Sequence, residues 1–277
     1  MGKHGDGVYT NSQQRITLTR FLTDRKGTIY FLVGLTAVCI AWYFAANAIN
    51  RSIVLPYFPD TMKAFFNNWT NAKIMHNLAI TLARVFRGFF YALMIGLPLG
   101  LVMGYSKTFM EAMTPLINSI RQVPIMAWVP LAIIWFGLGE GPTVFLITVA
   151  AVFPIMLNTM AGVMSIDPNY KHAARSMGAS TAAIFRDVIF PGALPSFLMG
   201  CRLALGLAWM SVICAEFIAT NSGFGFLMVE AQVRMWTADL YSLMIMSALV
   251  GYFIDRLLLM LEKSITSWRF RDAAFKN

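Results

Sequence analysis

The chain has 277 residues, of which 58% are hydrophobic and only 13% are charged. Soluble domains contain about 45–50% apolar residues with glycine included, so this composition excludes an ordinary water-soluble protein. The net charge of +9 would suit a nucleic-acid partner, but no basic, aromatic-interleaved face emerges, and we expect no nucleic acid to bind. We predict an all-α integral membrane protein of about six transmembrane helices, surrounded by membrane lipid.

The first 28 residues are polar and basic, and we expect a cytoplasmic tail there. The apolar run from Ile29 to Ile49 is long enough to span a bilayer. Bulky Trp42, Tyr43 and Phe44 stand where a signal peptide would carry small residues before its cleavage site, so we expect an uncleaved first span. After a turn at residues 55–59, Asp60 is a candidate N-cap for a short interfacial helix that reaches Trp69.

Five more apolar runs follow and bring the expected number of spans to six: Gly88 to Tyr105, Val123 to Leu138, Pro142 to Met164, Ala193 to Ile218 and Leu240 to Leu261. Gly96, Gly100 and Gly104 recur every four residues in the second span. Such a row of glycines forms a flat strip against which another helix packs closely. Pro124 and Pro130 predict kinks in the third span.

A long segment from about residue 165 to 195 is too polar to span the membrane. Asp167 is placed to cap a short helix that starts at Pro168 and ends at Gly178. Ser180 is placed to cap a second one, Thr181 to Ile189, which Pro191 is expected to stop. We predict two short amphipathic helices that form a protruding knob.

The distribution of positive charge predicts the orientation of the spans. With a cytoplasmic N-terminus, the inside segments hold 15 Lys and Arg residues, among them Lys107 and Arg121 in one loop. The outside segments hold six, among them Arg84 and Arg87 in the first loop. The positive-inside rule therefore favours cytoplasmic N- and C-termini.

Several chemistries lack their sequence signals. No GxxxxGK[ST] loop is present, so we expect the chain to bind no nucleotide or other cofactor. The three histidines lie outside the expected spans, and Cys39, Cys201 and Cys214 lack metal-ligand spacing, so we expect no catalytic and no metal site. Arg202 and Glu216 lie about 21 Å apart along one helix and cannot pair directly.

The knob resembles a known motif. His172-Ala173-Ala174, Gly178 and the run from Val188 to Pro191 match the spacing of the EAA loop of ABC-importer permeases, E-A-A-x3-G-x9-I-x-L-P. His172 replaces the glutamate of that pattern, Val188 the isoleucine and Phe190 the leucine. In that family the loop is a coupling helix that docks in a groove of a separate ATPase subunit.

The resemblance extends from about Leu55 to Glu262, to the branch of these permeases that serves nitrate, sulfonates, taurine and bicarbonate. It is carried by runs at residues 81–89, 96–100, 124–140, 190–195, 206–217 and 223–226, among them Trp135-Phe136-Gly137-Leu138-Gly139-Glu140. It implies the type I ABC importer permease fold, with a permease domain at 29–262, a core from about residue 77, a coupling loop at about 165–195 and a cytoplasmic tail at 263–277.

The resemblance also implies a function and its partners. The chain would be the non-catalytic transmembrane subunit, in a bacterial cytoplasmic (inner) membrane, of an importer that moves a small anion by alternating access. Its partners would be a second permease copy in a homodimer, two ATPase subunits that bind ATP and Mg, and an extracytoplasmic solute-binding protein. The implied ATPase-coupling residues are Tyr170, His172, Ala173, Ala174, Arg175, Met177, Gly178, Ala179, Phe185, Val188, Phe190 and Pro191.

Two other classes of function remain open at this point. A secondary transporter or channel working alone would need inverted repeats or buried ionisable groups along a pathway, and a membrane-embedded enzyme would need convergent acid–base residues. The sequence shows no convincing repeat and few such groups. For the translocation path, the candidates are Trp209, Met210, Ser211 and Glu216; because Glu216 would repel an anion, a structural or gating role suits it better.

Overall fold

The computed structural model describes residues 29–30 and 32–266. Contacts divide the chain into two compact units, the first ending at Lys63 and the second starting at Ala64. In the first unit, Leu32–Ile49 forms the expected apolar helix, and the Trp42 indole donates a hydrogen bond of 3.1 Å to the carbonyl of Pro56. The expected tail at residues 1–28 lies outside the described residues.

The helix predicted around residues 60–69 begins slightly earlier. It is α2, Phe58–Thr70, so Asp60 lies in its first turn and does not cap it. The negative charge of Asp60 still suits the positive end of the helix dipole.

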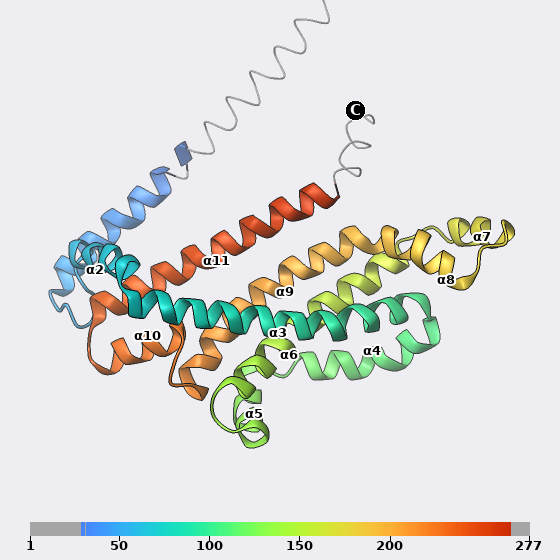
Figure 1. Ribbon diagram of the computed structural model, residues 1–277. Helices are drawn as coiled ribbons and strands as arrows, with labels where there is room; N and C mark the ends of the chain where they lie inside the picture. Colours follow the sequence, from blue (N-terminus) through green and yellow to red (C-terminus); the bar gives the residue numbers. More distant parts are fainter. Residues whose placement is uncertain (1–28, 31, 267–277) are drawn as a thin grey trace, which may run out of the picture. The chain divides into compact units, whose positions relative to one another are not determined.

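Over the residues that the structure describes, all of the regular secondary structure of the second unit is helical (Figure 1). After α2, its helices are α3 (Ala72–Tyr105), α4 (Lys107–Arg121), η1 (Ile125–Trp128), α5 (Val129–Phe136), α6 (Glu140–Met164), α7 (Pro168–Ser176), α8 (Thr181–Ile184), η2 (Phe185–Ile189), α9 (Phe190–Ala219), α10 (Phe224–Val233) and α11 (Thr237–Ile265). In the described part of the chain, five helices are long and apolar enough to cross a membrane, or six if one bent pair counts as a span. The predicted fold class is therefore confirmed.

The second span is longer than predicted. We placed its start at Gly88, but α3 begins at Ala72, where the Asn71 side chain accepts a hydrogen bond from the Lys73 amide. No glycine or proline interrupts residues 72–87, so nothing in the local sequence ends the helix before its apolar part begins. Arg84 and Arg87, which we assigned to a loop, therefore belong to this helix.

The third span differs most from its prediction. The expected helix Val123 to Leu138 is instead a bent pair, Lys107–Arg121 and Ile125–Phe136, whose axes differ by 88°. Pro124 stands at the break, where its missing N–H and its restriction of the preceding residue prevent a continuous helix. Arg121, which we counted in an inside loop, lies at this bend.

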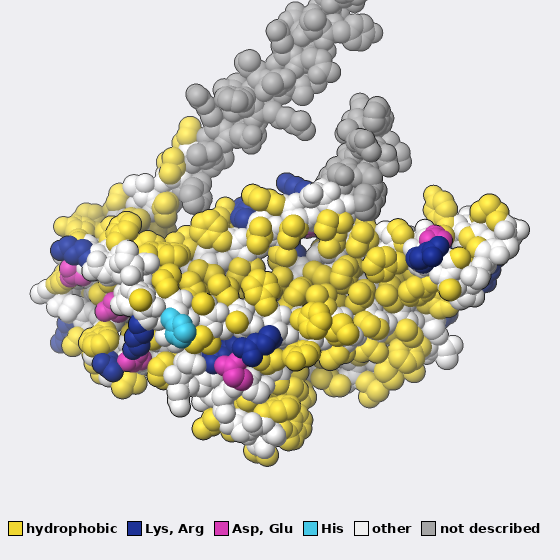
Figure 2. Space-filling model, in the orientation of Figure 1, with side chains coloured by type: hydrophobic (Ala, Val, Ile, Leu, Met, Phe, Trp, Pro, Cys, Tyr) yellow, Lys and Arg dark blue, Asp and Glu magenta, His cyan; other side chains and the backbone are white. Residues whose placement is uncertain are grey.

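The core of the second unit forms where α3, α6 and α9 pack together. The predicted glycine strip permits this approach. A Cβ atom at Gly100 would lie 2.5 Å from the carbonyl oxygen of Met156, and one at Gly96 would lie 2.9 Å from that of Val152. Figure 2 shows a face on which hydrophobic side chains cover most of the long helices, as expected for helices in contact with lipid.

Candidate functional site

The predicted knob is present as α7 and α8, which we call the loop helices. They lie at one end of the second unit, and α10 lies at the other end (Figure 1). The Asp167 side chain caps α7 by accepting a 2.8 Å hydrogen bond from the Asn169 amide. The Ser180 hydroxyl caps α8 by accepting one of 3.2 Å from the Ala183 amide. Both predicted caps are therefore confirmed.

Gly178 connects the loop helices with a backbone φ of +81°, and no atom lies within 4 Å of a Cβ built there. Residues with a side chain rarely adopt such a φ. Glycine is therefore required here by the backbone conformation and not by lack of space.

Pro191 does not stop the second loop helix as we predicted. α8 continues through the wide turn of η2, where the Phe190 amide donates to the carbonyl of Phe185, and then directly into α9. Pro191 lies in the first turn of α9, where a proline needs no N–H partner. The loop is therefore joined without a break to a helix long enough to cross the membrane.

One side of the loop helices packs on the ends of α3 and α6. Ala174, Ile184 and Ile189 are buried in a small apolar cluster with Leu101 and Val163, and Phe185, Val188 and Ala179 pack partly against it. The predicted apolar face of α8 is thus confirmed as a packing surface. This cluster attaches the loop helices to the bundle.

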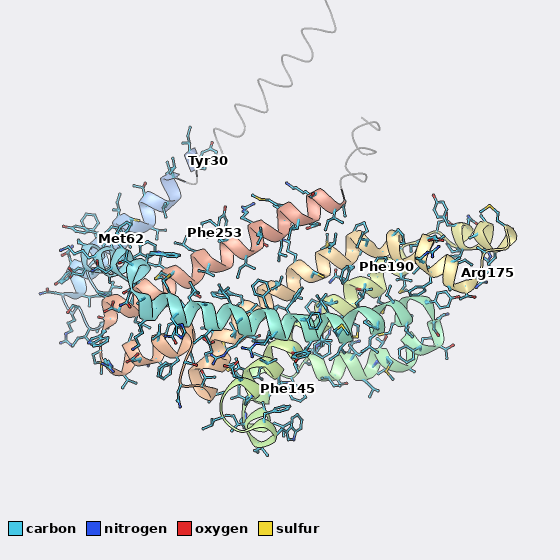
Figure 3. All side chains as sticks on the ribbon, viewed as in Figure 1. Tyr30, Met62, Phe145, Arg175, Phe190 and Phe253 are labelled. Carbon is cyan, nitrogen blue, oxygen red and sulfur yellow. The ribbon has the colours of Figure 1, made fainter. Side chains whose placement is uncertain are left out.

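The opposite side of the loop helices is exposed. Met177 is 82% exposed and Tyr170 is 66% exposed, although both are large and apolar in part. With Ile166, Ala173 and Val188 they line a groove of about 630 Å³. Of the other predicted coupling residues, those that are also exposed are His172, Arg175, Gly178, Phe190 and Pro191; Figure 3 labels Arg175 and Phe190. The Arg175 guanidinium donates a 3.4 Å hydrogen bond to the Tyr105 hydroxyl of α3.

At the α10 end lies an ion-pair cluster that the sequence did not predict, made of two buried residues, Arg84 and Glu216, and of Glu140, whose side chain is 48% exposed. Arg84 on α3 is 1% exposed and Glu216 on α9 is fully buried. One guanidinium nitrogen of Arg84 lies 2.7 Å from Glu216, and another lies 2.5 Å from Glu140 at the start of α6. The cluster joins three helices that lie far apart in the sequence.

Neutral groups complete the hydrogen bonds of this cluster. The Thr81 hydroxyl donates to Glu216 at 2.8 Å, and the Gly225 amide donates to the same carboxylate at 2.8 Å. Arg84 also donates to the carbonyl of Ser222 at 2.7 Å. A Cβ atom at Gly223 would collide with the Glu216 carboxylate, so this turn must stay small. A buried ion pair satisfied so fully acts as a structural joint.

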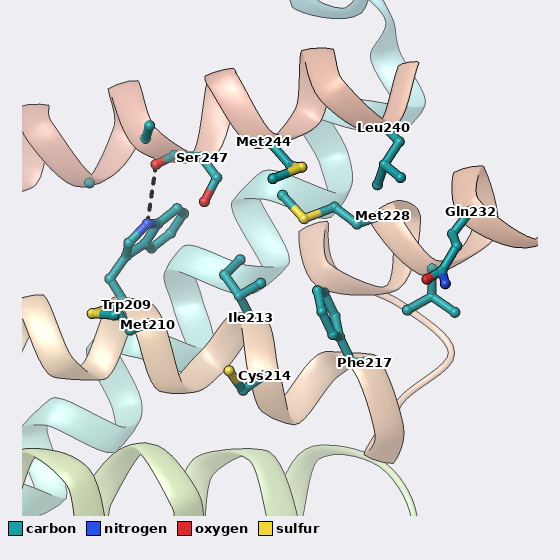
Figure 4. A pocket seen from close by; sticks show the side chains of 13 residues that line it. Trp209, Met210, Ile213, Cys214, Phe217, Met228, Gln232, Leu240, Met244 and Ser247 are labelled. Carbon is teal, nitrogen blue, oxygen red and sulfur yellow. Dashed lines mark hydrogen bonds between the residues drawn. The ribbon is translucent and has the colours of Figure 1, made fainter. Parts of the chain in front are cut away.

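The four predicted pathway residues do not line one cavity. The Trp209 indole donates a 3.2 Å hydrogen bond to the carbonyl of Ser247. Trp209 and Met210 line an apolar cavity of about 520 Å³ between α9, α10 and α11, shown in Figure 4. Ser211 lines a different cavity, against α4, η1 and α6. Glu216 belongs to the ion-pair cluster.

Arg84 and Glu140 are the residues that sequence reasoning missed. Both stood in the runs that carry the resemblance, at 81–89 and 124–140, but Arg84 was placed in a loop. An unbroken helix from Ala72 would have brought Arg84 into the span, where an arginine needs a carboxylate partner. Over the described residues, no group of three or more His, Cys, Asp or Glu side chains is arranged to hold a metal ion.

The fold and the loop define a class of protein: a bundle of helices long and apolar enough to span a membrane, with a pair of short helices attached at one end. Residues 96–267 match the family model of the binding-protein-dependent transport system inner membrane component. The chain is 35% identical to the taurine transport system permease protein TauC of Escherichia coli over 92% of each chain. It is 26% identical to the nitrate import permease protein NrtB of Synechocystis over 84% of this chain and 87% of the relative.

A solved structure agrees with this assignment at the level of the fold. The bacterial alginate ABC transporter, solved in complex with its alginate-bound periplasmic protein, contains a chain that is similar to this one with a TM-score of 0.61 and 15% identity, over 94% of this chain and 98% of that chain. The protein belongs to the family of binding-protein-dependent inner-membrane transport components. It is the non-catalytic, multi-pass permease subunit of an ABC importer in the inner membrane.

Proposed function

We propose that the protein forms the translocation path for a small anion and is driven by ATPase subunits that dock on the loop helices. The observation that carries the docking is the exposure of Met177 and Tyr170 beside a groove, also lined by Asp167 and Asp187, on a helix pair that packs on the bundle. Exposed apolar groups next to a groove are typical of a protein–protein interface.

The joint between the loop helices and α9 supports a mechanical role. Because α8, η2 and α9 follow one another without a break, a displacement of the loop is transmitted to a helix that spans the membrane. Closure of two docked ATPase subunits on ATP would move the loop as a rigid body and switch the path between its two openings. ATP and Mg would be bound by those subunits, and this chain would contribute no cofactor site.

The anion class is supported by the relatives, which are named for taurine and nitrate. Glu216 does not oppose this, because its carboxylate is buried and paired with Arg84. We propose further that two copies form a homodimer around the path and that a soluble binding protein delivers the anion at the α10 end. The loop helices and both termini would lie in the cytoplasm, as the positive-inside count favours.

The test is co-purification of this chain with its ATPase subunit, comparing the wild type with Gly178→Asp. We expect the complex to form with the wild type and to be lost with the variant, while the helical content of the membrane chain is unchanged. The matched control is Asn221→Asp, which places the same carboxylate at an exposed position near the α10 end. Retention of the complex by Gly178→Asp would contradict docking on the loop helices.

A further inference from the structure

The inner part of the bent span, α4, carries a row of polar side chains. Lys107, Glu111, Thr114, Asn118 and Arg121 recur at steps of four and three residues, which places them on one face of the helix. No residue of α4 is buried. In a membrane, a polar face of this kind must meet water or protein and not lipid.

This row leads from the loop end of the bundle to mid-depth. α4 starts beside Tyr105, whose hydroxyl accepts a 3.4 Å hydrogen bond from Arg175 of α7. Its 15 residues rise about 22 Å at 1.5 Å per residue. Across from its end, residues 149–158 of α6 line the same cavity, and they form the middle of the helix Glu140–Met164. Arg121 therefore lies level with the middle of α6, a helix long enough to cross a membrane.

Arg121 lines a cavity of about 490 Å³ at the bend between α4 and η1. Gln122, Asn158 and Ser211 add polar groups to its wall, and Trp128 adds an aromatic ring. No carboxylate is among the lining residues, and within the described residues Arg121 makes no ion pair. Arg84, by contrast, is neutralised by two carboxylates.

We propose that this cavity is an anion subsite halfway along the translocation path, in which Arg121 binds the oxyanion head of the solute. The planar guanidinium fork matches sulfonate, nitrate and carboxylate oxygens. The Gln122 amide supplies further donors, and so does the second N–H of Asn158, whose amide nitrogen already donates to the carbonyl of Pro154 at 2.9 Å. The volume is suited to a small solute. The α4 row then forms the polar wall from this subsite to the loop end.

This inference rests on the proposed function and deepens it, because it assigns selectivity for anions to a residue of the permease itself. A cation at mid-depth with no protein partner is costly unless water or a passing anion neutralises it. The solute must also leave the site for transport to continue, so its binding to Arg121 must be reversible. Arg121 is thereby a specificity-determining residue.

The first test is uptake in proteoliposomes that contain the complete transporter with its binding protein and ATP, with radiolabelled taurine and nitrate as probes. We expect Arg121→Gln to lower the uptake rate at least tenfold and Arg121→Lys to lower it less. Assembly with the ATPase should be unchanged. The matched control is Arg256→Gln, which removes the same charge from α11 at a residue that stacks over the Tyr252 ring and does not line this cavity.

The outcomes separate the two proposals. Anion uptake by the wild type that Arg121→Gln leaves unchanged would overturn the subsite and leave the proposed function standing. ATP-driven uptake of cationic or neutral solutes, with no uptake of either anion, would overturn both.

A second measurement does not depend on transport. In a chain whose Cys39, Cys201 and Cys214 are replaced by serine, Ser211→Cys reports the electrostatic field of the cavity through its reaction with thiosulfonate reagents. We expect the rate ratio of a sulfonate-bearing reagent to a quaternary-ammonium reagent to fall about tenfold when Arg121→Gln is added. An unchanged ratio would overturn the subsite even if the uptake variant failed to assemble.

Discussion

The ion-pair cluster at the α10 end and the groove at the loop end differ in how completely their side chains find partners within the chain. At the α10 end, the Arg84 guanidinium and the Glu216 carboxylate are buried and paired, and Arg84 also contacts the half-exposed Glu140. At the loop end, large side chains such as Met177 and Tyr170 are exposed around a groove. A saturated ion-pair cluster holds helices together, whereas exposed large side chains beside a groove are suited to bind a partner. The same helix, α9, connects the two.

The largest expected effect comes from breaking the ion-pair cluster. Glu216→Ala leaves the Arg84 guanidinium buried with one carboxylate fewer and removes the acceptor of the Thr81 hydroxyl and the Gly225 amide. We expect a loss of about 3–5 kcal/mol in the free energy of unfolding. Thermal unfolding in detergent micelles measures it. A melting temperature equal to that of the wild type would show that the cluster is not a structural joint.

A smaller effect is expected at the glycine strip. Gly100→Ala forces a Cβ atom to within 2.5 Å of the Met156 carbonyl, so α3 and α6 must separate, at a cost of about 1–3 kcal/mol. The matched control is Gly206→Ala on α9, where no atom lies within 4 Å of the added Cβ; it should gain about 0.5–1 kcal/mol. Both are measured by thermal unfolding, and equal effects of the two substitutions would disprove close packing at the strip.

At the loop end, substitutions should affect partner binding and not stability. Met177→Asp places a charge on the side chain that is 82% exposed, so the free energy of unfolding should change by less than about 0.5 kcal/mol. Affinity for the ATPase should fall at least tenfold, because the charge would be buried in the interface. Surface plasmon resonance with detergent-solubilised protein measures this affinity.

Val233→Asp is the control for Met177→Asp. It makes the same kind of change at a side chain that is 75% exposed, on α10 at the opposite end. Its affinity for the ATPase should equal that of the wild type. Equal losses for both variants would indicate a general effect of charge and would remove the distinction between the two ends.

The smallest effect is expected at Glu230 on α10. The Lys73 ammonium donates to Glu230 at 2.8 Å, and this hydrogen bond lowers the pKa of that carboxyl, with further help from Arg234. Because the pKa is lower in the folded state, the stabilisation is present above the unfolded-state pKa and is lost as the pH falls through the folded-state value. The pair is near the surface, so its contribution is below about 1 kcal/mol.

Glu230→Gln tests this pH dependence. Melting temperatures between pH 7 and pH 3 should fall less steeply for the variant than for the wild type. Identical slopes would show that the pair with Lys73 contributes nothing to stability.

Local signals predicted the loop end well and the α10 end poorly. Asp167, Ser180 and Gly178 act through their own backbone neighbours, so their roles could be predicted from spacing alone. The pair of Arg84 and Glu216 is separated by 132 residues, and no local pattern indicates it. The bend at Pro124 lies between these cases, because the proline indicated a kink but not the 88° angle.

The coupling-loop and pathway assignments stay predictions, although the structure describes all of their residues. Trp209, Met210 and Ser211 are consecutive on α9 and were predicted together, but successive residues on a helix point in different directions. Ser211 is the one among them that lines the cavity of Arg121. Because of this helical geometry, the three residues could not be expected to line one cavity.

The central claim is that transport by this chain is driven by ATP through the loop helices. The most direct measurement is solute uptake into proteoliposomes that hold the permease and its ATPase, with ATP inside and the binding protein outside. The account predicts uptake that requires both and that Met177→Asp abolishes while the membrane chain stays folded. Uptake driven by an ion gradient without ATP, and unaffected by Met177→Asp, would contradict it.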